Sequence, residues 1–158
     1  MNDACSRVLP LLACAATACA AIEVVRVPGA EDLHEPFSLA FVAKDDAYGV
    51  EFQPANRIFR LHAGKIEYVA GVKWNSAAKG AQPPAPAKPL DLAPAVFNGM
   101  HDVAIGPDGS VYAADSFQHR IVRFDPRTQA VTAFAGTGKA GFGGDGGPAD
   151  QAQFNIPM

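Results

Sequence analysis

Cysteine is scarce in this sequence and confined to its beginning. The three cysteines, Cys5, Cys14 and Cys19, all lie in the first twenty of 158 residues. If the chain is cleaved after Ala20, as an ordinary secretory leader is, the mature protein has no cysteine. It then has no disulfide, no thiolate metal ligand and no Cys-x-x-Cys-His haem site. Its stability has to come from side-chain packing.

Charged residues are also few, at 18% of the chain, and neither sign dominates. Lys plus Arg number 13 and Asp plus Glu number 16, which gives a formal net charge of -3. No basic run is present that could follow a nucleic-acid backbone or an anionic membrane surface, so nucleic acid is not an expected partner. Hydrophobic residues make up 49% of the chain, which excludes overall disorder and allows a buried core.

Long hydrophobic runs are missing beyond the first one, which covers residues 8–21 and follows Arg7. This run falls short of the roughly 20 apolar residues that a transmembrane helix needs, so we expect no transmembrane span. The small-residue site Ala18-Cys19-Ala20 completes the layout of a secretory signal peptide. We therefore predict a signal peptide over residues 1–20 and a secreted or periplasmic protein.

Three alternatives to an ordinary signal peptide stay open. Asp3 cancels the charge of Arg7 and Pro10 interrupts the apolar run, so a misassigned start codon or a buried helix would also fit. Ala16-Thr17-Ala18-Cys19 resembles a bacterial lipoprotein box, in which the cysteine thiol is lipidated before cleavage, although such boxes usually carry Leu where Ala16 stands. The third alternative is therefore a lipid anchor at Cys19.

The sequence after the leader repeats itself. Arg57-Ile58-Phe59-Arg60 is echoed 63 residues later by Arg120-Ile121-Val122-Arg123. Two further matches continue along the unit: Val69-Ala70-Gly71 with Phe134-Ala135-Gly136, and Ala95-Val96-Phe97-Asn98 with Ala152-Gln153-Phe154-Asn155. A repeat of this length is typical of solenoids, propellers or arrays, whose units must stack on one another.

Each unit contains four short apolar or alternating runs of strand length, separated by residues that favour turns. The predicted strands are residues 39–42, 48–52, 57–61 and 66–70 in the first unit and 102–105, 111–114, 120–124 and 131–135 in the second, with an isolated strand at 24–27. We predict two four-stranded antiparallel meanders packed face to face. The residues expected to be buried in the second unit are Val103, Ile105, Val111, Ile121 and Val131.

Long loops leave the fourth strand of each unit. The first contains the proline-rich residues 82–89, which cannot continue a strand and indicate a polyproline excursion. The second contains the glycine-rich residues 141–147, which lack both the Gly-Lys-Ser/Thr ending of a phosphate loop and the several carboxylates of a calcium loop, since only Asp145 is available. We interpret this stretch as a structural loop in which glycines allow positive φ and Asp145 caps a turn.

These motifs resemble the NHL-repeat β-propellers of bacterial secreted proteins. The resemblance rests on residues 106–126 and 135–157, with 35–41 at the start of the first unit. It implies an all-β β-propeller of about six four-stranded blades.

Two blades are then present within residues 21–158. They cover residues 36–96 and 97–153, residues 154–158 start a third, and residues 24–27 form the strand that closes the ring. One strand and two blades cannot close a ring, so we expect a fragment of a longer propeller, with a trimer of two-bladed chains as the alternative.

His101 and Asp102 are the leading candidates for chemistry, because they begin the innermost strand of a blade and could face the central channel. Propeller hydrolases and lyases resembling gluconolactonases hold a metal in that channel. A metal needs three or more converging ligands with supporting contacts, and two blades supply few. We expect no metal, no other cofactor and no catalytic site, with such an enzyme as the alternative; His34 and Glu35 raise the same question in the first unit.

Asp115, Ser116, His119 and Arg120 lie too close together in sequence to suggest an acid–base or nucleophile set. We expect them to satisfy local backbone groups at a turn between strands. Arg57 occupies the same repeat position as Arg120, which suggests that each arginine braces its own blade. The other residues assigned to the structural repeat motif are Gly136, Gly138 and Asp145.

The sequence therefore predicts a non-catalytic binding or scaffold module that presents propeller loops to a protein, peptide or carbohydrate partner. A terminal repeat unit without a neighbour exposes an apolar face. We accordingly expect residues 21–158 expressed alone to be poorly soluble or oligomeric.

Overall fold

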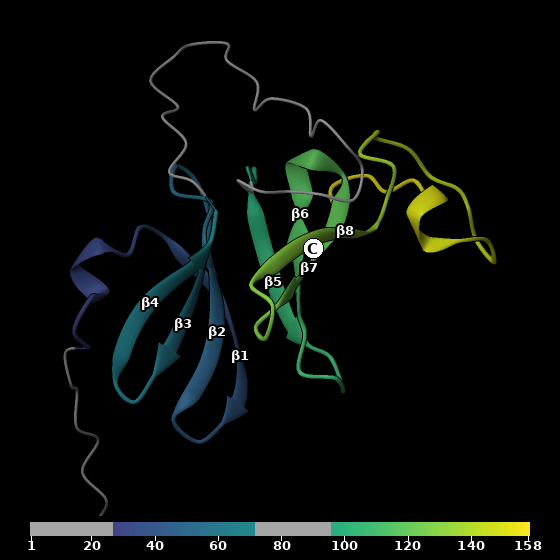
Figure 1. The fold of residues 1–158 in the computed structure, drawn as a ribbon. Helices are drawn as coiled ribbons and strands as arrows, with labels where there is room; N and C mark the ends of the chain where they lie inside the picture. Colours follow the sequence, from purple (N-terminus) through teal and green to yellow (C-terminus); the bar gives the residue numbers. More distant parts are fainter. Residues whose placement is uncertain (1–26, 72–95) are drawn as a thin grey trace, which may run out of the picture.

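The computed structural model describes residues 27–71 and 96–158, which form two antiparallel β-sheets (Figure 1). The first sheet consists of β1 (Pro36–Ala43), β2 (Asp46–Glu51), β3 (Ile58–His62) and β4 (Lys65–Ala70). The second consists of β5 (Met100–Ile105), β6 (Val111–Asp115), β7 (Arg120–Asp125) and β8 (Ala130–Ala135). In each sheet every strand pairs with the next along the chain. Three short 3-10 helices complete the described elements: η1 (Ala30–Asp32), η2 (Ser116–Gln118) and η3 (Ala149–Gln151).

The prediction of two four-stranded antiparallel meanders is confirmed, with strand ends shifted by a few residues. The largest shift is at β1, which begins at Pro36 rather than at residue 39. The glycine-rich residues 141–147 lie outside regular strands and helices, as predicted, with an isolated bridge between Gly143 and Gln153. The leader with its cysteines, residues 24–26 of the predicted isolated strand and the proline-rich stretch all lie outside the described residues.

The sequence Gly106-Pro107-Asp108-Gly109-Ser110 shows why the strands turn where they do. Gly109 has a φ of 78°, a conformation that glycine adopts without steric cost. The Ser110 N–H donates a hydrogen bond of 3.0 Å to Oδ1 of Asp108, which is the local side-chain bond that favours Asp in turns. Gly106 N–H and Ser110 C=O then close the turn between β5 and β6 at 2.8 Å.

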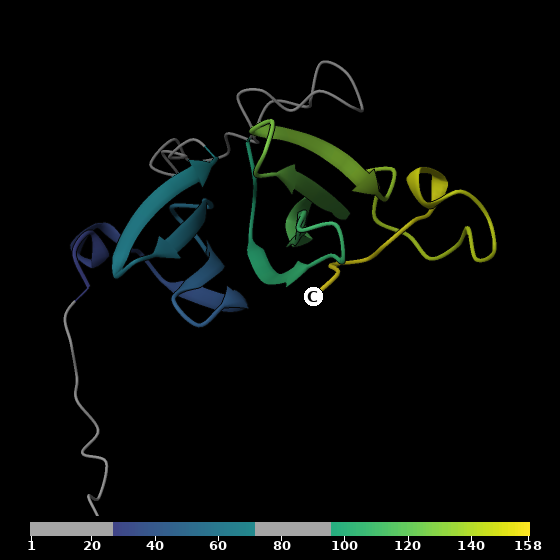
Figure 2. The ribbon, with the colours of Figure 1, turned by 60° about the horizontal axis from the view of Figure 1, so that its bottom comes forward.

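The core lies between the two sheets, which are stacked face to face with β1 beside β5 (Figure 2). Tyr48 from the first sheet packs against Phe124 from the second, with ring centroids 6.2 Å apart. The other buried members of this cluster are Val50, Ile58, Phe97, Met100, Val103, Val111, Ala113, Val122 and Val131. Neither sheet buries this apolar surface alone, so each stabilises the other.

Burial of the five residues predicted for the second unit is confirmed for three of them. Val103, Val111 and Val131 are buried, whereas Ile105 and Ile121 are only half-buried. Ile121 precedes Val122, whose side chain faces the first sheet, so alternation along the strand places Ile121 on the opposite face. Ile105 is the last residue of β5 and packs against the edge of the core.

A glycine after the fourth strand joins each unit to the segment that follows it. Gly71 has a φ of 98°, and a Cβ there would lie 2.7 Å from the Asn56 carbonyl oxygen and 3.2 Å from the Phe97 ring. Gly136 repeats this with a φ of 93°, where a Cβ would lie 2.6 Å from the His119 carbonyl oxygen and 2.9 Å from Phe154. The ring of a phenylalanine thus contacts each glycine from one side and a backbone carbonyl oxygen contacts it from the other, which leaves no room for a side chain at either position.

A hydrogen bond also holds each of these two segments in place, two residues after its phenylalanine. The Gly99 N–H donates to Oδ1 of Asn56 at 2.7 Å, and the Ile156 N–H donates to Nδ1 of His119 at 3.2 Å. Gly99 and Ile156 both have positive φ, 65° and 52°. Residues 154–156 are therefore attached to the second unit as residues 97–99 are attached to the first.

Candidate functional site

Four ring side chains gather where the two sheets meet, and we call them the aromatic–histidine cluster: Phe37, Phe52, His101 and Phe117. The His101 ring centroid lies 5.0 Å from that of Phe37, 4.8 Å from that of Phe52 and 5.9 Å from that of Phe117. Phe37 comes from β1, Phe117 from η2 and His101 from β5. Phe37 is 57% exposed and Phe117 is 40% exposed, so the cluster presents apolar area to solvent.

The His101 ring is held in one orientation by its Nδ1 atom. Nδ1 lies 2.9 Å from the Gly99 carbonyl oxygen and 2.9 Å from Oγ of Ser116. Because a carbonyl oxygen can only accept, Nδ1 carries the proton in the neutral ring and Nε2 is the acceptor. Ser116 in turn donates from Oγ to the Pro157 carbonyl oxygen at 2.5 Å. This chain of bonds leaves Nε2 as the ring atom that can accept a hydrogen bond from a bound partner.

Asp102 does not join His101, although the two are adjacent in sequence. Oδ1 of Asp102 accepts hydrogen bonds from Oγ of Ser38 at 2.5 Å and from the Val103 N–H at 2.8 Å. The His101 ring bonds to Gly99 and Ser116 instead, so the two candidate ligands have separate partners. Within residues 27–71 and 96–158, no group of three His, Cys, Asp or Glu side chains is placed to hold a metal ion.

His34 and Glu35 contribute backbone groups to the start of β1. The His34 N–H donates to Oε1 of Glu51 at 2.7 Å, and the Glu35 carbonyl oxygen accepts from the Phe52 N–H at 2.9 Å. Glu35 has a φ of 46°, which matches the positive φ of Gly99 before β5. These two residues therefore shape the segment that leads into the first sheet.

Arg57 forms a buried ion pair in the first unit. Its Nε lies 2.6 Å from Oε2 of Glu51, whose side chain is fully buried, and its Nη2 donates to the Asp32 carbonyl oxygen at 2.9 Å. The guanidinium also lies over the Tyr68 ring, 3.6 Å from its centroid. Arg57 thus ties the end of β2, the segment before β1 and β4 together.

Arg120 forms the corresponding pair in the second unit. Its Nη2 lies 2.7 Å from Oδ2 of Asp115 and donates to the Val96 carbonyl oxygen at 3.2 Å, while Oδ1 of Asp115 accepts from the Asn98 N–H at 2.7 Å. Burial raises the pKa of Asp115 to about 6, against the opposing effect of the Arg120 charge and the Asn98 bond. We call Glu51–Arg57 and Asp115–Arg120 the two carboxylate–arginine clamps. Both carboxylates are buried, and both pairs bond to backbone groups of the segment before a sheet, so the clamps position that backbone.

The repeat in the sequence indicates Arg57 and Arg120 but not Glu51. Glu51 could have been found from the sequence, because an acidic residue ends the second strand of both units. A simple alignment of the units misses it, since the carboxylate precedes the arginine by six residues in the first unit and by five in the second. Gly136 directly follows β8, and Gly138, with a φ of 75°, and the exposed Asp145 lie in the loop after it.

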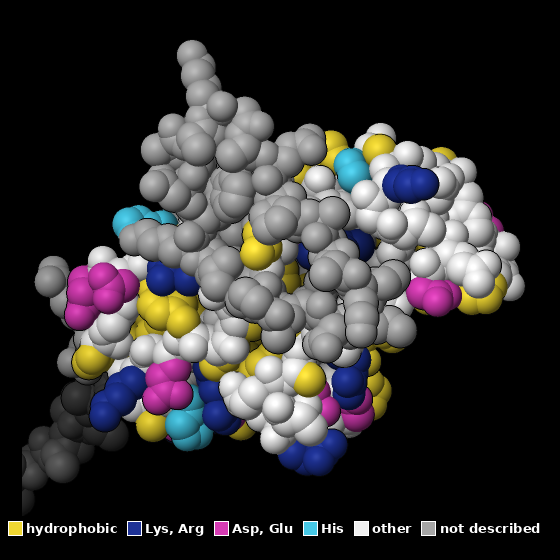
Figure 3. Space-filling model, turned by 45° about the horizontal axis from the view of Figure 1, so that its top comes forward, with side chains coloured by type: hydrophobic (Ala, Val, Ile, Leu, Met, Phe, Trp, Pro, Cys, Tyr) yellow, Lys and Arg dark blue, Asp and Glu magenta, His cyan; other side chains and the backbone are white. Residues whose placement is uncertain are grey.

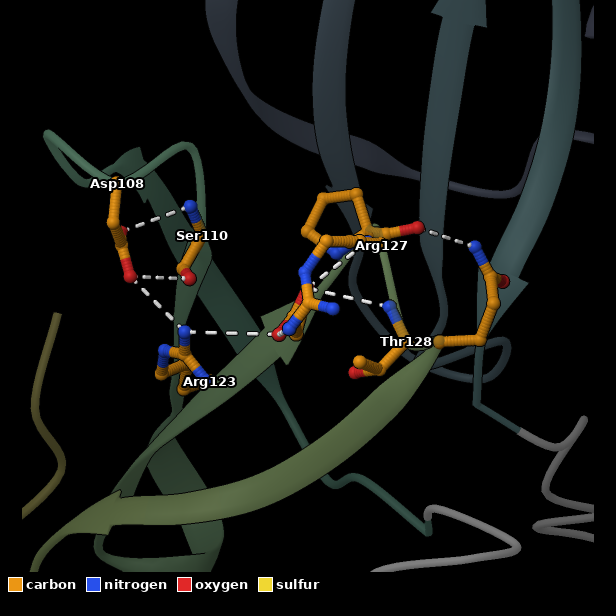
Figure 4. Close-up of polar contacts among 8 residues, drawn as sticks. Asp108, Ser110, Arg123, Arg127 and Thr128 are labelled. Carbon is orange, nitrogen blue, oxygen red and sulfur yellow. Dashed lines mark hydrogen bonds and ion pairs between the residues drawn. The ribbon is translucent and has the colours of Figure 1, made fainter.

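A shallow hollow of about 320 Å³ lies between the β5–β6 and β7–β8 turns, and Figure 4 shows its polar contacts. Asp108 accepts hydrogen bonds from the backbone and hydroxyl of Ser110 and from Arg123, which together lower its pKa to about 2. Asp125 lies 3.9 Å from Arg123 and 3.8 Å from Arg127. Two carboxylates and two guanidiniums balance here, so the hollow offers no excess charge to an ionic ligand.

The surface has no extended field of one sign on the face shown in Figure 3, where acidic and basic side chains are interspersed. None of the helices in the described part of the chain is long and apolar enough to cross a membrane.

No protein-family model matches the chain. A 35-residue segment is 54% identical to the chloroplastic protein SUPPRESSOR OF QUENCHING 1 of Arabidopsis thaliana, but this is 22% of the chain and 3% of that protein.

Two solved structures from Bacteroides thetaiotaomicron share the all-β fold. One, a protein of unknown function, has a TM-score of 0.55 and 21% identity over 77% of the chain. The other, an auxiliary nutrient binding protein, has a TM-score of 0.52 and 20% identity over 75% of the chain. The chain spans 28% and 30% of their lengths.

Proposed function

We propose that this chain is a non-catalytic binding or scaffold module that contributes two blades to an NHL-type β-propeller. It contacts a protein, peptide or carbohydrate partner through the aromatic–histidine cluster. The observation that carries the proposal is that Phe37 and Phe117 are exposed around a His101 ring whose Nδ1 is bonded within the protein, so that Nε2 is its acceptor atom. The buried clamps, by contrast, have their polar atoms engaged within the protein.

The propeller assignment is supported by the way the units repeat. Both units contain a carboxylate–arginine clamp, and both have a glycine after the fourth strand that contacts a phenylalanine of the following segment. In both, the backbone N–H two residues after that phenylalanine donates a hydrogen bond to the unit. A third segment, residues 154–156, already docks on the second unit in that manner. Repetition of one packing step is what builds a radial array of sheets.

The chemistry of the cluster suits a partner that is apolar on one side and carries hydroxyl or amide donors. Binding sites combine aromatic surface with a few polar groups that fix orientation. The Phe rings supply the surface, and Nε2 of His101 supplies one acceptor. The likeness to an auxiliary nutrient binding protein supports a ligand-binding role.

Binding can be tested with the full-length chain on a glycan array and against a phage-displayed peptide library. We expect retention of at least one probe, and we expect the double variant Phe37→Ala, Phe117→Ala to weaken it at least tenfold. Phe142→Ala is the matched control, because Phe142 is a 95% exposed aromatic residue of the loop after β8 and is no part of the cluster. Equal retention by the double variant, with the fold checked by circular dichroism, or no retained probe would overturn the proposal.

We also propose that the protein is exported by means of residues 1–20. The arrangement of Arg7, the apolar run and the small-residue site supports this. Mass spectrometry of the mature N-terminus tests it: Ala21 indicates ordinary cleavage and a lipidated Cys19 indicates a lipoprotein. An intact Met1 would refute export.

A further inference from the structure

Two hydrogen bonds of different chemistry attach residues 154–157 to the second unit. The Ile156 N–H donates to Nδ1 of His119 at 3.2 Å, and Oγ of Ser116 donates to the Pro157 carbonyl oxygen at 2.5 Å. The bond to Pro157 contains no group that gains or loses a proton near neutral pH, whereas the acceptor of the Ile156 bond is an imidazole nitrogen. The Ile156 bond therefore requires the neutral ring of His119, with its proton on Nε2.

The first unit makes the equivalent attachment with an amide. Asn56 occupies the repeat position of His119, and its Oδ1 accepts from the Gly99 N–H at 2.7 Å. Both residues have a left-handed backbone, with φ of 48° at Asn56 and 53° at His119. An amide oxygen accepts a hydrogen bond whatever the pH, but an imidazole nitrogen accepts one only when it carries no proton. The two attachments therefore differ in how they respond to acid.

Few charged groups lie around His119 in the part of the chain that the structure describes. The segments nearest to it, which are residues 154–157, η2, β8 and residues 136–138, carry no acidic or basic side chain. The exposed Asp150 belongs to η3, which packs against β8. Arg120 and Asp115 follow and precede the turn, but both are buried and paired with each other at 2.7 Å. A positively charged His119 ring therefore gains no counter-charge from the segments nearest to it.

We propose that His119 makes the attachment of residues 154–156 to the second unit dependent on pH. At neutral and higher pH the imidazole accepts the Ile156 N–H. When the ring takes up a second proton, both of its nitrogens are donors, and rotating the ring cannot restore an acceptor. The bond from Ser116 to Pro157 remains, so the segment is loosened and not released. This inference goes beyond the proposed binding role and does not depend on it.

Nuclear magnetic resonance of the full-length chain with isotope-labelled isoleucine tests the proposal at the Ile156 amide. Its exchange rate is compared with the intrinsic rate at each pH, which gives a protection factor. We expect this factor to fall about fivefold or more from about pH 8 to about pH 5, the range in which histidine changes charge, as for the loss of one hydrogen bond. The Ile156 amide shift and the His119 ring shifts should change with the same midpoint.

His119→Asn is the decisive variant, because it puts the acceptor of the first unit at the same repeat position and because asparagine tolerates positive φ. Protection of the Ile156 amide should then be the same at both pH values. His62→Asn is the matched control, since His62 is an exposed histidine of the first sheet, 3.5 Å from Asp46. It should leave the fall in Ile156 protection unchanged.

Asp115 is the other group near this turn that titrates in the same range, because burial raises the pKa of Asp115 to about 6. A fall in protection that persists in His119→Asn would therefore assign the effect to Asp115 and overturn the proposal. Constant Ile156 protection in the unchanged chain, or different midpoints for Ile156 and His119, would also overturn it. If His119→Asn does not fold by circular dichroism, His119→Gln replaces it, because it also removes the titrating ring.

Discussion

At the scale of single residues, the two carboxylate–arginine clamps connect strand ends to the segments that precede each sheet. In each clamp the carboxylate accepts a backbone N–H from that segment, and the arginine donates to a carbonyl two residues earlier in it. A buried ion pair of this kind is costly to break because the remaining charge has no counter-ion. Replacing a single member of a clamp should therefore be strongly destabilising.

Arg120→Met is expected to lower the free energy of unfolding by about 3–5 kcal/mol, because it leaves the Asp115 carboxylate buried without its partner. Chemical denaturation well above pH 6 measures the loss, because the loss of Arg120 raises the pKa of Asp115 further. Arg123→Met is the control and should cost much less, since the pair that Arg123 forms with Asp108 is solvent-exposed and screened. Equal losses for the two variants would contradict the role assigned to the clamp.

Asp108 gives a pH-dependent prediction. Its pKa is lowered to about 2, first by the two bonds from Ser110 and then by Arg123. Its contribution to stability is thus present above the ordinary Asp pKa and is lost as pH falls through about 2. Ser110→Ala should raise the Asp108 pKa toward its ordinary value, as followed by carboxyl NMR titration, and Arg123→Gln should raise it less. The reverse order would show that the guanidinium dominates.

At the scale of elements, the segments between sheets depend on glycines with positive φ. Gly71 and Gly136 also lie against backbone carbonyl oxygens, so a side chain there meets both a conformational penalty and a steric clash. Gly109 has positive φ but no atom within 4 Å of its Cβ position, and Gly143 has neither constraint. Comparing substitutions at these glycines therefore separates the penalty for positive φ from the steric clash.

Substitution by alanine should therefore cost different amounts at three positions. Gly143→Ala is expected to change the free energy of unfolding by less than about 0.5 kcal/mol. Gly109→Ala should cost about 1 kcal/mol for its φ alone, and Gly136→Ala should cost clearly more because the His119 carbonyl oxygen must move. Thermal or chemical denaturation of the three variants measures the series, and a Gly109→Ala cost equal to that of Gly136→Ala would show that the close contact relaxes freely.

The strands could be predicted from the sequence because alternating apolar residues and turn residues such as those at 106–110 act locally. The aromatic–histidine cluster could not. Phe52 and Phe117 stand at different positions of the repeat, so aligning the units does not bring them together. The contact of Phe52 with His101 and Phe117 depends on how the second sheet packs against the first, which is a long-range property of the fold.

At the scale of the whole molecule, one shared core makes the two sheets depend on each other. Tyr48, Val50 and Ile58 from the first sheet are covered by residues of the second, and Phe97 from the connecting segment lies among them. Repeat units that gain most of their stability from neighbours unfold together when the interface is strong. The described units should thus behave as one cooperative body.

Phe124→Ala tests this, because Phe124 is fully buried in that core. It is expected to lower the free energy of unfolding by about 3–5 kcal/mol and to reduce amide-exchange protection in both sheets to a similar degree. Phe142→Ala, at a 95% exposed position, should leave protection unchanged. Loss of protection confined to β5 through β8 would show that the first sheet is stable by itself.

Because residues 97–99 are attached to the first unit, they determine where the chain can be cut when units are exchanged to build chimaeras. A cut between residues 71 and 96 keeps all four strands of the first sheet but removes Phe97 from Gly71 and the Gly99 N–H from Asn56. The segment to exchange as one unit therefore does not coincide with the four strands of a sheet. It starts with β5 and ends at Ile156, beyond β8. Libraries that shuffle units at this offset boundary should yield more folded chimaeras than libraries joined in the linker.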